Sequence, residues 1–260
     1  NAVKLAKQFT DDVEYFMEDS GRADPQYVYR VVEAVIDAGA TVINVPDTTG
    51  YTFPTEYMAL IRGIIENVPN SNKATFSCHC HNDLGMATAN TLAGVVGGAR
   101  QVEVTVNGIG ERAGNTALEE VVTSFAIRKD FFNVSTNIKL AKLMDISRLV
   151  SRLTGMMVQR NKAVVGANAY AHSSGIHQDG VLKDRLNYEI IAPELVGAAR
   201  SEIILTARSG RHGVKHRLAE MGFSFTDDRF ERIYEGFLRV ADTKKEVTED
   251  DLKELVDTVK

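Results

Sequence analysis

The chain has 260 residues, of which 44% are hydrophobic and 25% are charged, and its formal net charge at pH 7 is −5. This composition predicts a globular protein whose core is large enough for one domain and a smaller appendage. The negative charge and the scattered Lys and Arg residues argue against a nucleic acid or an acidic membrane as a partner. The apolar runs are far shorter than the roughly 20 residues of a bilayer-spanning helix.

The first half of the chain alternates β-branched runs with helical patterns. Pro25 suits a first helical turn, and Gly39 suits the end of that helix. Such alternation predicts βα units and a parallel sheet. We expect strands at residues 13–17, 41–46, 74–79 and 101–106, and helices at residues 25–38, 57–65, 86–96 and 116–127.

Polar residues follow each expected strand: Glu18 and Asp19, Asp47 and Thr48, residues 79–83, and residues 107–115. A (β/α) barrel builds its active site from the loops at these strand ends. Four units make half of an eight-stranded barrel. An open four-stranded α/β sheet fits the same pattern.

The alternation ends near residue 135. We expect a Gly/Ser-rich loop at residues 163–180 and helices at residues 138–153, 214–221, 228–240 and 249–259. The predicted domains are therefore residues 1–135, the C-terminal half of a barrel, and residues 136–260, a small and mainly helical subdomain. Residues 1–10 resemble the end of a helix, and residue 1 is not Met, so we expect further sequence upstream.

The two cysteines, Cys78 and Cys80, lie in one extended segment. They are too close to bridge each other and too few for a disulfide scaffold. A reducing, cytoplasmic setting is expected.

The same segment carries His79 and His81. Alternate side chains of a strand share a face, so the two histidines point one way, roughly 6.6 Å apart at Cα, and the cysteines point the other way. Both imidazoles can then reach one metal ion. A mixed Cys and His zinc shell would need ligands from opposite faces. Buried cysteines beside hydrogen-bonded histidines are the alternative without a metal.

A loop with three glycines, residues 107–115, follows the fourth strand. Its spacing is neither a Walker A motif nor a dinucleotide fingerprint. Asn115 is expected at the start of the following helix, where an N-cap is the ordinary role. A neighbouring strand end would also bring its amide oxygen beside His79 and His81.

With these residues the sequence resembles the 2-isopropylmalate synthase family. The similarity extends over the whole chain and rests on residues 13–19, 46–51, 79–85, 107–115, 172–180 and 209–211. Homocitrate and citramalate synthases share the His-x-His and Gly-Glu-Arg-x-Gly-Asn motifs, and residues 175–183 favour the isopropylmalate enzyme. The resemblance implies a (β/α)8 TIM barrel followed by small helical subdomains.

The resemblance also implies a metal site. By position, His79 and His81 match the two histidine ligands and Asn115 matches an asparagine ligand. Imidazole and oxygen donors suit Mg²⁺, Mn²⁺ or Zn²⁺.

Four further positions match residues of the family's active site. Glu18 and Thr48 correspond to residues that line the pocket for the 2-oxo acid and acetyl-CoA. Glu111 and His177 correspond to residues of the acid–base steps. From the residues alone, Glu18 could pair with Arg22, and Thr48 could cap a helix.

The implied reaction is the Claisen condensation of acetyl-CoA with 2-oxoisovalerate, the first committed step of leucine biosynthesis, in a homodimer. Homocitrate synthase, citramalate synthase, a related lyase and a non-catalytic domain are the alternatives. The family's first-strand metal-binding aspartate, its neighbouring arginine and the leucine-sensing domain have no match among these residues. We therefore expect the 260-residue chain alone to be inactive.

Overall fold

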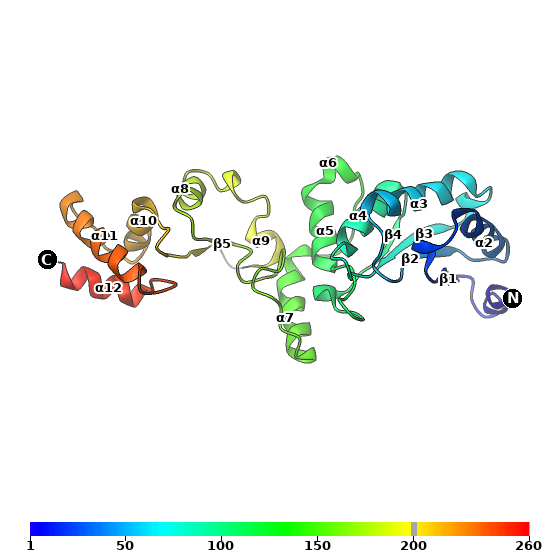
Figure 1. Ribbon diagram of the computed structural model, residues 1–260, viewed down its shortest axis with the longest axis horizontal. Coiled ribbons are helices and arrows are strands. Elements are labelled where there is room, and N and C mark those ends of the chain that lie inside the picture. Colours follow the sequence, from blue (N-terminus) through cyan, green and yellow to red (C-terminus); the bar gives the residue numbers. More distant parts are fainter. Residues whose placement is uncertain (199–201, 260) are drawn as a thin grey trace. The chain divides into compact units, whose positions relative to one another are not determined.

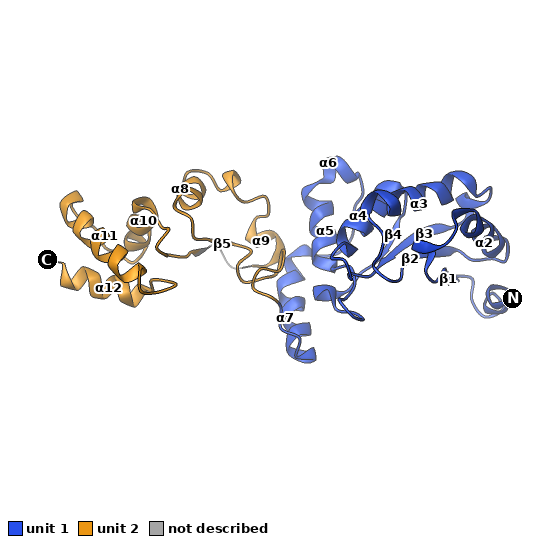
Figure 2. Ribbon diagram, viewed as in Figure 1, with its two compact units in different colours: residues 1–158 blue, residues 159–260 orange. Residues whose placement is uncertain are grey.

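The computed structural model describes residues 1–198 and 202–259 (Figure 1). Residues 1–158 and residues 159–260 form two compact units (Figure 2). The boundary between the units lies later than the expected residue 135, because helix α7 (Leu143–Thr154) packs on the 3-10 turn η3 (Val106–Gly108) and so belongs to the first unit. None of the helices among the described residues has the length and apolar character needed to cross a membrane.

The first unit contains the four predicted βα pairs. Besides α7 and η3, its elements are α1 (Ala2–Ala6), β1 (Glu14–Phe16), η1 (Ser20–Arg22), α2 (Pro25–Asp37), β2 (Val42–Asp47), α3 (Pro54–Asn67), η2 (Ser71–Lys73), β3 (Thr75–Cys80), α4 (Ala87–Gly97), β4 (Gln101–Glu103), α5 (Leu118–Ile127), α6 (Lys129–Phe132) and η4 (Leu140–Lys142).

The sheet is parallel throughout, with the strand order β1-β2-β3-β4. Right-handed crossovers between consecutive neighbours place all of the connecting helices on one face. In agreement, α2 packs on α3 and α3 packs on α4. A doubly wound sheet would instead reverse direction and carry helices on both faces. The predicted fold class, four βα units of a (β/α) barrel followed by a mainly helical subdomain, is confirmed.

Local sequence determines where α2 begins and ends. The Asp24 carboxylate accepts a hydrogen bond from the Tyr27 amide at 3.0 Å, and Pro25 fills the first turn. Gly39 follows the helix with φ of +107°, a conformation that favours glycine. Val28, Val32 and Ile36 are buried, as the apolar spacing predicts.

The core of the first unit lies between the sheet and its helices. Tyr57 of α3 and Cys78 of β3 are fully buried there, and Gly94 of α4 packs against both. A Cβ atom at Gly94 would lie 2.4 Å from the Cys78 sulfur, so α4 approaches the sheet as closely as it does because residue 94 has no side chain.

The second unit is mainly helical and has its own apolar core between α10, α11 and α12. Its elements are β5 (Ala171–His172), α8 (Gly175–Lys183), η5 (Arg185–Asn187), α9 (Pro193–Val196), β6 (Glu202–Ile203), α10 (Arg211–Glu220), α11 (Asp227–Ala241) and α12 (Glu249–Thr258).

The expectation of a loop throughout residues 163–180 was wrong, because β5 and the first turns of α8 lie within it. Gln178 provides the reason. Its side chain is fully buried and donates to the carbonyl oxygens of His172, at 2.9 Å, and of Ile204, at 3.0 Å. These bonds join α8 to β5 and to the segment after β6, contacts that glycine and serine content does not reveal.

Candidate active site

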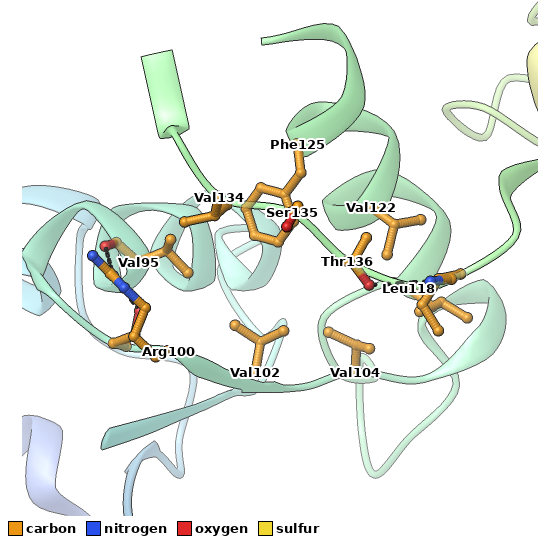
Figure 3. Close-up of a pocket in the computed structure, with 12 residues that line it drawn as sticks. Val95, Arg100, Val102, Val104, Leu118, Val122, Phe125, Val134, Ser135 and Thr136 are labelled. Atoms are coloured by element: carbon orange, nitrogen blue, oxygen red, sulfur yellow. Dashed lines mark hydrogen bonds between the residues drawn. The ribbon is translucent and has the colours of Figure 1, made fainter. Parts of the chain in front are cut away.

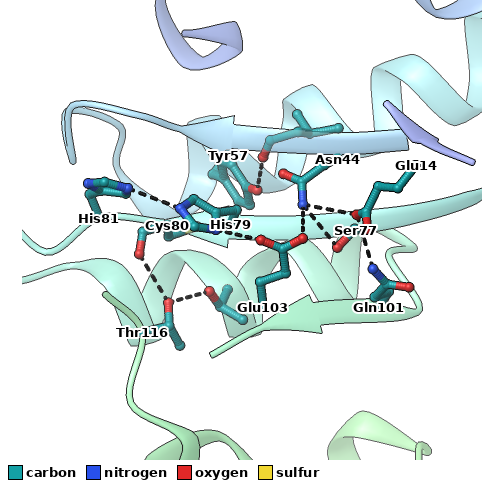
Figure 4. Close-up of polar contacts among 12 residues, drawn as sticks. Glu14, Asn44, Tyr57, Ser77, His79, Cys80, His81, Gln101, Glu103 and Thr116 are labelled. Atoms are coloured by element: carbon teal, nitrogen blue, oxygen red, sulfur yellow. Dashed lines mark hydrogen bonds and ion pairs between the residues drawn. The ribbon is translucent and has the colours of Figure 1, made fainter. Parts of the chain in front are cut away.

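The carboxyl end of β3 carries the histidine pair (Figure 4). Nε2 of His79 lies 3.0 Å from Nε2 of His81. Cys78 and Cys80 are buried on the opposite face, against the helices. The predicted alternation of this segment is therefore confirmed.

A chain of hydrogen bonds fixes the tautomers of both imidazoles. Nη2 of Arg112 lies 2.7 Å from Nδ1 of His81, and because a guanidinium only donates, this nitrogen accepts. The other nitrogen of neutral His81 then carries the proton and donates to Nε2 of His79. His79 is left with its proton on Nδ1, 2.7 Å from Oε2 of Glu103. Burial lowers the pKa of His81, and the positive charge of Arg112 adds to this effect, which favours the neutral form.

Glu103 belongs to a polar network on the inner face of the sheet (Figure 4). The Asn44 amide donates to Oε1 of Glu103 at 2.5 Å and to Oε1 of Glu14 at 3.2 Å, and Gln101 donates to the same Glu14 oxygen at 3.1 Å. Burial raises the pKa of Glu103, and Glu14 adds to this effect while His79 opposes it. Sequence patterns did not single out Glu103.

Asn115 lies in the glycine loop and pairs with His81 through an isolated antiparallel bridge. The expectation that Asn115 begins a helix, and its alternative role as an N-cap, were wrong: α5 starts at Leu118 and its N-cap is Ala117. The loop instead turns back at Gly114, where φ is +98° and an added Cβ would lie 2.1 Å from the Gly108 oxygen.

The side chain of Asn115 lies against the glycine loop. Its Oδ1 is buried and has no hydrogen-bond partner among the described residues. It packs against Gly110, where an added Cβ would lie 2.4 Å from it. This oxygen is therefore available to accept from, or to bind, another group.

Arg112 connects the glycine loop to two strand ends. Besides His81, its guanidinium contacts the Asp83 carboxylate at 2.8 and 2.9 Å and the Thr48 carbonyl oxygen at 2.8 Å. Glu111 is exposed, and its carboxylate lies 3.6 Å from the Arg112 guanidinium. The motif that contains Arg112 was recognised from the sequence, but its contact with His81 was not.

The two predicted substrate-binding residues lie at the ends of neighbouring strands. Glu18 is exposed, and the alternative pairing with Arg22 was wrong, because Arg22 binds Asp19 at 2.6 Å. The hydroxyl of Thr48 accepts from the Asp19 amide at 2.9 Å. Thr48 does not cap α3, whose N-cap is Phe53.

His177 lies in the second unit, on α8, and not in the loop that the sequence predicted. Its ring is exposed and packs on Tyr188, with the ring centroids 4.3 Å apart.

The donor set near the histidines fits a divalent cation. No group of three His, Cys, Asp or Glu side chains suited to a metal ion occurs among residues 1–198 and 202–259. The imidazoles of His79 and His81 and the side-chain oxygen of Asn115, whose backbone pairs with that of His81, are nitrogen and oxygen donors of the kinds that divalent cations bind.

A separate pocket of about 330 Å³ lies behind the edge strand β4 (Figure 3). It is mostly apolar, and its one charged group, Arg100, donates to the backbone oxygens of Val95 and Ala99. The pocket contains none of the residues predicted for chemistry. Its lining residues are Val95, Ala99, Arg100, Val102, Val104, Leu118, Val122, Phe125, Val134, Ser135, Thr136 and Ile138.

A parallel sheet with its helices on one face and polar residues at its strand ends is the arrangement of one half of a (β/α) barrel, a fold whose enzymes build their active sites at that edge. Residues 1–150 match the family model described as HMGL-like, and the chain belongs to this family. Residues 164–245 match the model described as homocitrate synthase post-HMGL domain-like.

Curated relatives confirm the resemblance to 2-isopropylmalate synthases. The chain is 56% identical to the 2-isopropylmalate synthase of Olsenella uli over 254 residues, which are 98% of this chain and 50% of that protein. It is 55% identical to the Pyrococcus furiosus enzyme of the same name over 255 residues, 98% of this chain and 51% of that protein. The chain thus spans about half the length of the curated relatives it matches.

A solved structure supports the fold. The crystal structure of hydroxymethylglutaryl-CoA lyase from Pseudomonas aeruginosa is 21% identical, with a TM-score of 0.51 over 60% of this chain and 54% of that chain.

Proposed function

We propose that this chain is part of the catalytic region of a 2-isopropylmalate synthase. This enzyme condenses acetyl-CoA with 2-oxoisovalerate and hydrolyses the thioester, the first committed step of leucine biosynthesis. The observation that carries the proposal is the 56% identity to a protein of this name across 98% of the chain. The histidine pair at a strand end supports it, since barrel enzymes act at that edge.

In this proposal His79, His81 and Asn115 hold a divalent cation, Mg²⁺, Mn²⁺ or Zn²⁺. When bound, the cation supplies Lewis-acid polarisation of the keto group of the 2-oxo acid. The Nε2 of His79 carries no proton and accepts from His81, so His79 needs no change of tautomer to act as a ligand. His81 must transfer its proton to Nδ1 before its Nε2 can act as a ligand, so Arg112, which now donates to Nδ1, must release it.

The remaining residues handle substrate and protons. Glu18 and Thr48 line the substrate pocket. His177 removes a methyl proton from acetyl-CoA, and the electron pair of that bond forms the new bond to the keto carbon, while the keto oxygen gains a proton and becomes a hydroxyl group. Water then cleaves the thioester to a carboxylate and free CoA thiol, and Glu111 orients the water or the imidazole. The position of each residue in the family motifs supports its role.

The proposed assembly is a cytoplasmic homodimer in which the helical subdomain of one subunit covers the barrel of the other. The ring of His177 is exposed, so it is accessible to a substrate bound by the partner subunit.

The test is release of CoA thiol from acetyl-CoA by a protein that carries this chain together with the further sequence of its relatives. We expect 2-oxoisovalerate to give a higher kcat/KM than 2-oxoglutarate or pyruvate. Homocitrate synthase is the second candidate, because residues 164–245 match a model with that description. A kcat/KM that favours 2-oxoglutarate would assign the chain to homocitrate synthesis. Absence of thiol release with every 2-oxo acid would identify a non-catalytic domain.

A further inference from the structure

Glu103 and His79 are direct partners across the β3–β4 ladder. Their side chains leave the sheet on the same face, and Oε2 of Glu103 lies 2.7 Å from Nδ1 of His79 (Figure 4). Two rigid strands therefore set this contact.

The other oxygen of Glu103 is also held. Asn44, which is fully buried on β2, donates to Oε1 at 2.5 Å. With one oxygen bound by Asn44, the carboxylate keeps its second oxygen directed at the imidazole. The carboxylate thus has little freedom to turn away from His79.

We propose that Glu103 is the positioning residue for His79: by accepting the Nδ1 proton it fixes the ring and directs the Nε2 lone pair towards the cation site. The inference rests on the proposed function, in which His79 holds the cation. A carboxylate in this position also raises the basicity of the imidazole that it contacts.

The two histidines therefore differ in tautomer, and only His79 has the one that leaves Nε2 unprotonated for a cation. His79 has the tautomer that a ligand needs, because its partner is an acceptor. His81 has the opposite tautomer, because its partner Arg112 is a donor.

Mn²⁺ and Zn²⁺ titrations of the 260-residue chain by calorimetry test the proposal. Glu103→Ala is expected to weaken binding about 10- to 100-fold. Glu103→Gln should recover most of the affinity, because its amide oxygen can still accept from Nδ1 of His79. Asn44, whose Nδ2 donates to this position in the wild type, can turn its amide so that Oδ1, which has no partner among the described residues, accepts from the new amide nitrogen. Glu14→Ala is the matched control, since Glu14 contacts Asn44 but not His79 in the network.

A second readout needs no metal. In ¹⁵N spectra of the metal-free chain, His79 should carry its proton on Nδ1, and Glu103→Ala should redistribute it between the two nitrogens. If Glu103→Ala does not fold, the tautomer of His79 in the wild type and the titration of Glu103→Gln still test the positioning role of Glu103.

Wild-type affinity in Glu103→Ala, with binding lost in His79→Ala, would overturn the role of Glu103 alone. Unchanged binding in His79→Ala would overturn the cation site itself and, with it, this part of the proposed function. A wild-type His79 with its proton on Nε2 would also overturn the positioning role.

Discussion

Gly110→Ala tests the role of Asn115 without changing Asn115 itself. Gly110 lies outside the left-handed backbone region, so alanine fits its φ. Its new Cβ, however, would lie 2.4 Å from Oδ1 and 2.6 Å from Cγ of Asn115. The flexible amide must therefore turn away from its present position, while the backbone needs to shift only slightly.

The expected cost in stability is small. An Asn115 side chain displaced from its rotamer costs about 0.5–1.5 kcal/mol. Replacing glycine by alanine returns about 0.4–1 kcal/mol through the unfolded chain. The net change of about 1 kcal/mol or less corresponds to a shift of the thermal midpoint within about 4 °C.

The expected cost in metal binding is large. Removing even an outer partner of a ligand lowers affinity about 10- to 100-fold, so displacing a ligand should cost at least about tenfold, or about 1.4 kcal/mol. Calorimetric titration with Mn²⁺ measures the loss of affinity in Gly110→Ala. Gly210→Ala is the control, because its Cβ would make only an ordinary contact of 3.8 Å with Gly175.

The reasoning about Gly110 would be refuted by a variant that binds Mn²⁺ within twofold of wild type while Asn115→Ala binds weakly. Unchanged binding in both variants would remove Asn115 from the metal site.

Three further predictions concern other parts of the chain. His177→Ala should lower kcat strongly in the active protein while leaving the thermal midpoint nearly unchanged, because the ring is exposed; a lower midpoint with unaltered kcat would make His177 structural. Burial raises the pKa of Cys78 and raises that of Cys80 to about 12, so iodoacetamide at about pH 8 should modify both thiols only after unfolding; rapid labelling of the folded chain would contradict this. The hydrogen bond from Lys244, aided by Thr248, lowers the pKa of Asp251 from 3.8 to about 2. The stability that Asp251 contributes is therefore present above pH 3.8 and lost as the pH falls towards about 2. The difference in thermal midpoint between wild type and Asp251→Asn should shrink across that window, and a constant difference would exclude the effect.

Much of the first unit could be predicted from the sequence, because its signals are local. Pro25 and Gly39 bracket α2, and the alternation of residues 78–81 places the histidines on one face and the cysteines on the other. Each of these features depends on steric preferences within a few residues, so it does not depend on how the rest of the chain folds.

The chemistry around the histidines depended on tertiary structure. Glu103 reaches His79 only because β3 and β4 pair in one register, and a register is a property of two strands. Glycines at positive φ turn the loop of residues 107–115 back on itself. Arg112 therefore reaches His81, and Asn115 lies in the loop and not at the start of α5. The sequence by itself determined which residues carry donors and which face they occupy. Only the folded chain decided which nitrogen of each imidazole holds the proton, because that depends on whether the neighbour brought up by the fold is a donor or an acceptor.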